Sequence, residues 1–162
     1  MKLYLKQKFF SMDDSFKVLD INGKDKYYGK SESVFPGKIF RLYDMKENEL
    51  AAVEERCSEF GSKKYFIHMN GKQVCEVVNK NSFFKERYIA EGLGLEIEGD
   101  FFARRFNITR KGNRVVVLNK KAVSRGDCYE IDIENESDVI NALALVIVID
   151  CIREAREVGG GC

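Results

Sequence analysis

The sequence predicts a mainly β (α+β) fold: a closed antiparallel barrel of about 12 strands wrapped around a buried hydrophobic helix at the C-terminus. Two observations lead to this prediction. The first 135 residues contain short alternating apolar and polar runs separated by turn signals, with essentially no helical periodicity. The most apolar stretch of the chain, DVINALALVIVIDCIREAREVGGG at residues 138–161, follows them.

Length and composition indicate one domain over residues 1–162, with strands at about 2–134 and the central helix at about 136–158. Hydrophobic residues make up 44% of the chain and charged residues 33%, which is typical of a globular protein. The 27 basic residues nearly balance the 26 acidic ones. Because nucleic-acid-binding domains are usually strongly basic, we expect no nucleic-acid partner.

Turn signals divide the N-terminal part into hairpins. Asn-Gly pairs at residues 22–23 and 70–71 are strong signals, because both central positions of a type I′ turn need a positive φ. Further turns are predicted around Glu47-Asn48, Gly92 and Gly112-Asn113. Each hairpin begins with an aromatic residue at a spacing of about 23, which indicates one repeated hairpin unit. These aromatic residues are Phe16, Phe40, Tyr65, Tyr88, Phe106 and Tyr129.

The C-terminal stretch is predicted to be a helix inside the protein. Its uninterrupted apolar run covers only residues 142–149, whereas a bilayer span needs about 20 apolar residues. The β-branched run at residues 146–149 leaves a strand open, but the flanks favour a helix. Ser137 is a plausible N-cap among acidic residues, and Gly159 follows basic residues and can end the helix.

The predicted strands and the predicted helix require each other. A set of about 12 strands must close or stack to hide its edges. Inward side chains can fill a barrel of about eight strands, so a barrel of about 12 strands is too wide for its own side chains to fill. A helix that is apolar around its whole circumference must be buried on every side. We therefore expect the helix to fill the barrel.

Residues suited to catalysis or metal binding are few. His68, the only histidine, lies on an alternating strand, and no Cys/His spacing fits a zinc site. A nucleotide-binding glycine loop is absent. Cys75 and Cys128 are expected to be small core residues, and the recurring Asp14 and Asp127 to be turn residues. We therefore predict a protein that is not an enzyme and has no cofactor, metal or catalytic residues.

The cysteines favour a reducing compartment. There are five of them, an odd number, and no CxxC motif occurs. The N-terminus MKLYLKQKFF has no long apolar run before a cleavage site. We expect a reduced cytoplasmic protein with a free thiol in its GGGC tail, located in the cytosol or peripherally at the membrane.

Three segments resemble the LURP-one-related family: KQKFFSMDDSFKVLDINGK, EIEGDFFARRFNITRKGN and SRGDCYEIDIE followed by DVINALALVIVID. The resemblance covers nearly the whole chain. Each segment alone is moderately specific, and their occurrence in this order makes the resemblance strong. It implies the tubby C-terminal-like fold, a 12-stranded barrel around a hydrophobic helix that is shared with phospholipid scramblases. Tubby-like barrels bind anionic headgroups through surface Lys and Arg, which implies a similar function here.

Three function classes are compatible with these features. The first is a binding module for anionic phospholipid headgroups or the membrane surface, with Arg110, Lys111 and Arg114 as headgroup candidates around a hairpin turn. No carboxylate lies between Asp100 and Asp127 in the sequence to neutralise them. The second is an intracellular protein-interaction or regulatory scaffold without lipid binding. The third, an enzymatic or scrambling activity, is disfavoured by the short apolar run and its polar neighbours.

Removing residues 138–162 should leave a chain that is unfolded or aggregates, because the barrel loses its filling. The milder change Leu145→Ala should lower the free energy of unfolding by about 2–5 kcal/mol, as other large-to-small core changes do. Thermal unfolding followed by circular dichroism checks both. A truncated chain that melts cooperatively near the full-length temperature would contradict the prediction.

Overall fold

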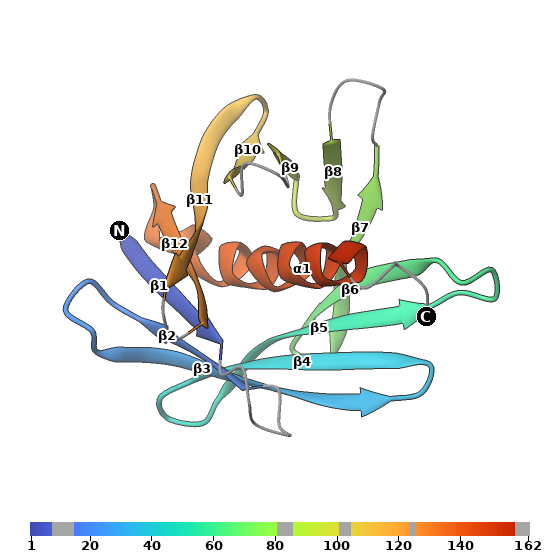
Figure 1. The fold of residues 1–162 in the computed structure, drawn as a ribbon, viewed down its shortest axis with the longest axis horizontal. Helices are drawn as coiled ribbons and strands as arrows, with labels where there is room; N and C mark the ends of the chain where they lie inside the picture. The colour runs from blue at the N-terminus through green and yellow to red at the C-terminus, as the bar shows by residue number, and fades with distance from the viewer. Residues whose placement is uncertain (8–14, 81–85, 101–104, 124–125, 158–162) are drawn as a thin grey trace.

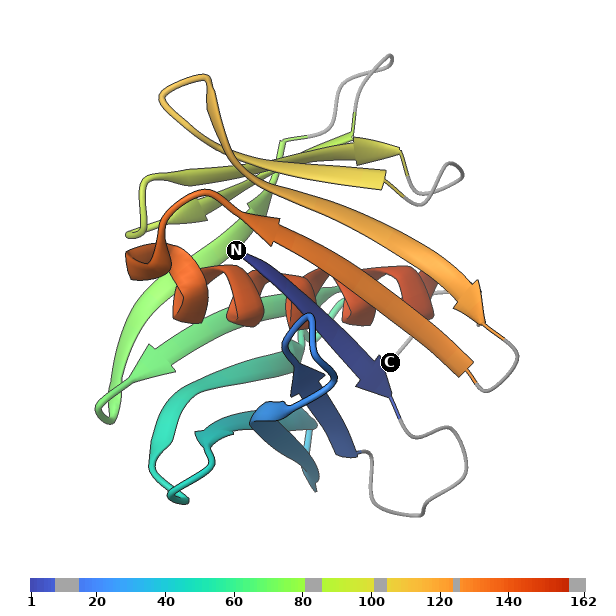
Figure 2. The same ribbon diagram turned by 90° about the vertical axis from the view of Figure 1, so that its left-hand side faces the viewer.

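The computed structural model describes residues 1–7, 15–80, 86–100, 105–123 and 126–157, and in it twelve antiparallel strands close into a barrel around one helix (Figures 1 and 2). The predicted fold class is confirmed. Each strand pairs with its neighbours in sequence, and β1 closes the barrel by pairing with β12. The strands are β1 (Lys2–Gln7), β2 (Ser15–Leu19), β3 (Asp25–Val34), β4 (Gly37–Asp44), β5 (Glu49–Cys57), β6 (Lys63–Met69), β7 (Lys72–Asn79), β8 (Glu86–Glu91), β9 (Leu95–Asp100), β10 (Arg105–Arg110), β11 (Asn113–Val123) and β12 (Gly126–Ile133).

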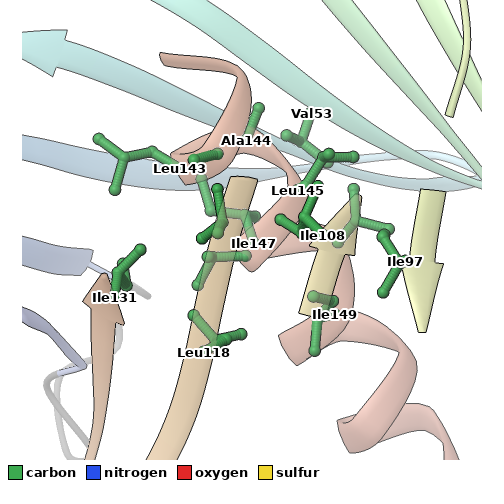
Figure 3. Close-up of a cluster of buried hydrophobic side chains, with 14 of the residues drawn as sticks. Val53, Ile97, Ile108, Leu118, Ile131, Leu143, Ala144, Leu145, Ile147 and Ile149 are labelled. Carbon is green, nitrogen blue, oxygen red and sulfur yellow. The ribbon is translucent and has the colours of Figure 1, made fainter. Parts of the chain in front are cut away.

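The helix α1 (Val139–Glu157) runs through the barrel and is buried on all sides over most of its length. Leu143, Leu145, Val146 and Ile149 have no exposed surface. Figure 3 shows helix side chains packing between residues of several strands, including Val53, Ile108 and Ile131. A strand at residues 146–149 is thereby excluded. Among the described residues, no helix is long and apolar enough to span a membrane.

The helix begins differently from the prediction. A single 3₁₀ turn, η1 (Glu136–Asp138), precedes α1, so Ser137 lies within this turn and is not the N-cap. The preceding residue Asn135 makes no side-chain capping bond. Instead, the Asp138 carboxylate is buried against a strand side chain, which fixes where the chain enters the barrel. The predicted stop at Gly159 lies outside the described residues.

The repeated aromatic residues all lie on the even-numbered strands. Five of them are buried, and Phe40 packs against the core while partly exposed. Two face glycines on neighbouring strands: a Cβ at Gly29 would lie 1.9 Å from the Phe16 ring, and one at Gly99 would lie 2.3 Å from the Phe106 ring. These glycines therefore leave room for the rings between the wall and α1.

Both Asn-Gly glycines have the predicted positive φ, but only one pair forms a type I′ turn. Asn70 and Gly71 have φ of 53° and 74°, as that turn requires. At residues 22–23 only Gly23 has a positive φ, of 79°, and the turn spans residues 20–24, where the Gly23 N–H donates to the Asp20 carbonyl. In the β10–β11 hairpin the turn lies one residue earlier than predicted. Lys111 and Gly112 adopt positive φ, and Asn113 already pairs with Arg110 in the ladder.

Two loops share one hydrogen-bonding pattern that the sequence did not indicate, and a third loop has part of it. In loops 20–24 and 44–48, the first residue is an aspartate whose Oδ1 accepts backbone N–H bonds two and four residues later, at 2.8–2.9 Å. In loop 58–62 the Ser58 hydroxyl oxygen accepts one such bond, from the Ser62 backbone N–H four residues later, at 3.1 Å. Local polar side chains thus stabilise these turns and hold two carboxylates in place.

The two ends of the barrel carry different turns and loops. We call the end where α1 begins the proximal end; it carries the turns at 20–24, 44–48, 70–71, 92–94 and 111–112. We call the end where α1 ends the distal end; it carries the β3–β4 turn at residues 35–36 and loop 58–62. In Figure 1 these two distal hairpins project together on the side of the last helical turns.

The substitution Gly29→Ala should destabilise the fold by about 1–3 kcal/mol, because its methyl group would overlap the Phe16 ring and force a repacking of the core. Chemical denaturation measures the loss. The double change Gly29→Ala with Phe16→Leu should recover part of it, since the smaller side chain vacates the space. Equal stability of Gly29→Ala and the wild type would show that the ring is not held there.

Candidate functional site

Inward-facing side chains become polar toward the distal end. By the alternation of strand side chains, several charged or amide residues occupy inward positions next to buried apolar ones. These are Lys38, Glu55, Lys63, Asn79 and Lys120. Elsewhere the same rows consist of apolar residues such as Val53, Ile67 and Leu118. The distal end is therefore the part of the barrel interior with chemistry suited to a ligand.

One polar cluster lies between β5, β6 and α1. Glu55 is buried, and its carboxylate lies 3.4 Å from the Lys63 ammonium. Burial raises the pKa of Tyr65, and the neighbouring Glu55 carboxylate, which accepts a hydrogen bond from the tyrosine hydroxyl, raises it further. The fully buried Cys151 thiol of α1 also has a raised pKa because burial disfavours its thiolate. The cluster thus holds protonated donors and no activated nucleophile.

A second polar cluster closes the other side of the same end. The Tyr129 hydroxyl donates a hydrogen bond of 2.8 Å to the Asp150 carboxylate of α1. Arg153, one turn later, donates to the same carboxylate at 3.1 Å. The Lys120 ammonium lies 5.6 Å from the centre of the Tyr129 ring. These contacts tie the end of the helix to β11 and β12 and satisfy the buried Asp150.

A pocket of about 530 Å³ opens through the barrel wall at the distal end. It lies between β6 and β7, whose pairing ends at Tyr65 and Val77 although both strands continue. Beyond this point β6 stays paired with β5, and β7 with β8. The volume falls in the range of about 300–1,000 Å³ that is usual for small-molecule pockets.

Two phenylalanine side chains project into solvent at the same end. Phe35 in the β3–β4 turn is 99% exposed, and Phe60 in loop 58–62 is 95% exposed. Their hairpins are neighbours because β4 pairs with β5, and Gly37 lies opposite Arg56 in that ladder. Two large aromatic side chains exposed to this degree on neighbouring hairpins make this end a candidate surface for contact with an apolar partner.

The predicted headgroup residues Arg110, Lys111 and Arg114 lie at the opposite, proximal end. Lys111 and Arg114 are exposed at the β10–β11 turn. Arg110 instead forms two hydrogen bonds with the buried Asp138 carboxylate, at 2.7 and 3.1 Å. The sequence showed no nearby carboxylate because Asp138 is 28 residues away and meets Arg110 only in the fold. A role of the three residues in lipid binding stays a prediction.

Other candidate residues have structural surroundings. The His68 ring Nε2 lies 3.0 Å from a Glu54 carboxylate oxygen across the β5–β6 ladder. Cys75 and Cys128 are free and buried, and burial raises the pKa of both thiols. In the described part of the chain, no group of three or more His, Cys, Asp or Glu residues could hold a metal ion.

Cys57 is disulfide-bonded, which differs from the expected reduced state. The GGGC tail with its predicted free thiol lies outside the described residues. Cysteine count and the absence of CxxC carry no information about cysteines that the fold brings together from distant parts of the chain. Asp14 lies outside the described residues, and Asp127 lies in β12.

Sequence reasoning missed the distal site, although part of the signal was present. Asp150 ends the apolar run of the helix, and charged residues occupy alternate positions at the ends of several predicted strands. Which end of each strand faces the end of the helix follows only from the closed topology. The divergence of β6 from β7 had no signal in the sequence.

Comparisons with known proteins agree with the fold. The model of the LURP-one-related family matches residues 1–150. The Uncharacterized protein YxjI of Bacillus subtilis (strain 168) is 31% identical over 152 residues, which cover 94% of this chain and 93% of that protein. The X-ray structure of a protein from Arabidopsis thaliana has a TM-score of 0.62 at 13% identity, over 93% of this chain and 91% of that one. At this identity, the likeness concerns the fold alone.

Arg110→Gln should lower the free energy of unfolding by about 1–3 kcal/mol, because the buried Asp138 carboxylate loses its two hydrogen bonds. Lys111→Gln and Arg114→Gln, matched changes in the same hairpin, should leave stability nearly unchanged because both side chains are exposed. Chemical denaturation of the three variants gives the comparison. Equal small effects in all three would show that the Arg110–Asp138 pair does not anchor the helix start.

Proposed function

Because the chain belongs to the LURP-one-related family over most of its length, we propose that it is a tubby-like binding module without catalytic activity that attaches to membranes containing anionic phospholipid. The observation that carries this proposal is the pair of exposed aromatic tips, Phe35 and Phe60, at the distal end. The thiol of the polar clusters inside that end, Cys151, has a raised pKa and is not activated as a nucleophile, which favours binding over catalysis.

The two aromatic tips supply an apolar contribution to membrane binding. Phenylalanine side chains on surface segments bury well at the boundary between headgroups and acyl chains. Complete burial of such a side chain contributes about 1.5–3 kcal/mol relative to exposure. Because Phe35 and Phe60 lie on adjacent hairpins, both can enter one membrane surface at the same time.

Positive charge next to the tips supplies an electrostatic contribution. Lys64 at the start of β6 and Lys80 after β7 are both exposed at the distal end. Each basic residue close to an anionic bilayer contributes about 1 kcal/mol. Loop 58–62 also contains one exposed carboxylate, Glu59, so the attraction is modest and the aromatic tips carry more of the affinity.

The proximal end is less suited to an anionic surface. It also exposes apolar tips, Ile21 at 69% and Met45 at 53%. These side chains are smaller and less exposed than Phe35 and Phe60. The exposed charges around them are mixed: Lys24, Lys46, Lys72, Lys111 and Arg114 with Glu47, Glu91, Glu134 and Glu136. The proposal therefore assigns the contact to the distal end, where the larger aromatic tips lie.

Flotation with phosphatidylcholine vesicles, with and without phosphatidylserine, tests the proposal. The wild type should bind the anionic vesicles better, and binding should fall as salt rises, because salt screens exposed charges. The double change Phe35→Ser with Phe60→Ser should weaken binding by about tenfold or more, since two apolar contacts are lost. The matched double change Ile21→Ser with Met45→Ser at the proximal end should leave it unchanged.

The same assay separates the alternatives. If Arg110→Gln, Lys111→Gln and Arg114→Gln together abolish binding and the phenylalanine changes do not, the predicted proximal cluster is the membrane site. Equal flotation of the wild type on neutral and anionic vesicles, or none on either, would overturn the lipid proposal. The intracellular protein-interaction scaffold would then be the function to pursue.

A further inference from the structure

The pocket between β6 and β7 exposes the side of the buried helix. Lys63 and Lys64 on β6, and Val78 and Asn79 on β7, lie beyond the last paired residues of the two strands. Through this opening Ile152 and Ala155 of α1 form the floor of the pocket. This is therefore a place where a ligand from outside can contact the helix.

The pocket is apolar below and polar at its rim. Besides the helix residues, Tyr65, Val77 and Tyr88 line its deep part, and all three are largely buried. The rim carries Ser62 and Asn79 together with two lysines. An apolar base with a few convergent polar groups is the usual arrangement of a small-molecule site. It fits a molecule with one hydrocarbon chain and a polar head.

The charges of the residues that line the pocket indicate the charge of the ligand's polar head group. Lys63 and Lys64 are the cations that line the pocket, and Glu76 is the carboxylate. Because Lys63 is also paired with the buried Glu55 carboxylate, Lys64 is the cation best placed for a ligand, and the site suits a single negative charge better than a phosphate dianion. Lys63 also contacts Glu55 at 3.4 Å, whereas Lys64 is exposed and has no ion pair within the described part of the chain.

We propose that this pocket binds one fatty acid, with its carboxylate at Lys64 and Lys63 and its chain against Ile152, Ala155 and Val77. This inference goes beyond attachment to a membrane surface, since it concerns a single lipid molecule inside the barrel wall. It draws on the proposed function only for the supply of the ligand. The pocket and Phe60 are close in the fold, because loop 58–62 leads directly into β6.

Isothermal titration with laurate, kept below the concentration at which it forms micelles, tests the inference without vesicles. Heat is a suitable signal because the chain has no tryptophan for a fluorescence assay. The wild type should bind laurate saturably with one site. Dodecyltrimethylammonium, which has the same chain length and the opposite charge, should bind more weakly.

Two substitutions address the two halves of the pocket. Ala155→Phe should weaken laurate binding by about tenfold or more, because its ring occupies the floor. Lys64→Gln should weaken binding about two- to fivefold, as expected for the loss of an exposed charge pair. Lys111→Gln at the proximal end is the matched control and should change nothing. If Ala155→Phe does not melt cooperatively, Val78→Phe fills the pocket from its wall instead.

The outcomes distinguish this inference from the membrane proposal. The double change Phe35→Ser with Phe60→Ser should keep laurate binding while its vesicle binding is weakened. The fatty-acid site is overturned if laurate shows no saturable binding to the wild type, if Ala155→Phe or its substitute Val78→Phe binds as well as the wild type, or if the cationic amphiphile binds equally. Each of these results leaves vesicle flotation to decide the membrane proposal by itself.

Discussion

The burial of one helix that is apolar on every side is the constraint on which the whole structure depends. A helix of this kind has no stable place at the surface, and twelve strands alone enclose a space too wide for their own side chains. Each part therefore supplies what the other lacks. Hydrophobic burial is the dominant favourable contribution to folding, and here most of it is shared between α1 and the inner face of the wall.

Side chains of the wall have sizes that suit a central helix. Aromatic rings recur on the even strands, where they reach inward, and at Gly29 and Gly99 the neighbouring strand omits its side chain to make room. The same repeat that gives the sequence its period of about 23 residues thus gives the barrel its inner layer. Since protein interiors are packed as densely as crystals, rings and glycines must match in position.

We expect the binding function at the distal end, where the apolar packing between the wall and α1 ends. Toward the distal end the helix carries Asp150 and Arg153, and the inward strand positions carry charges, so the interior accepts polar groups there. At the same end the wall opens between β6 and β7, and two phenylalanines extend into solvent. The proximal end, in contrast, uses its polar residues for turns and for the buried pair that fixes the helix start. The two ends of one barrel therefore have different chemistry.

The sequence by itself determined the fold class, the single helix, most of the turns and the absence of familiar catalytic or nucleotide-binding motifs, because these features depend on local periodicity and turn chemistry. It did not reveal that Arg110 meets Asp138, that Cys57 is disulfide-bonded, or that Phe35 and Phe60 lie on neighbouring hairpins. It also contained no sign of the pocket beneath Lys64. These features join residues far apart in the chain, and only the closure of the barrel around α1 sets their distances. Tertiary structure decided them because charge pairing and exposure depend on neighbours in space, which the order of residues does not contain.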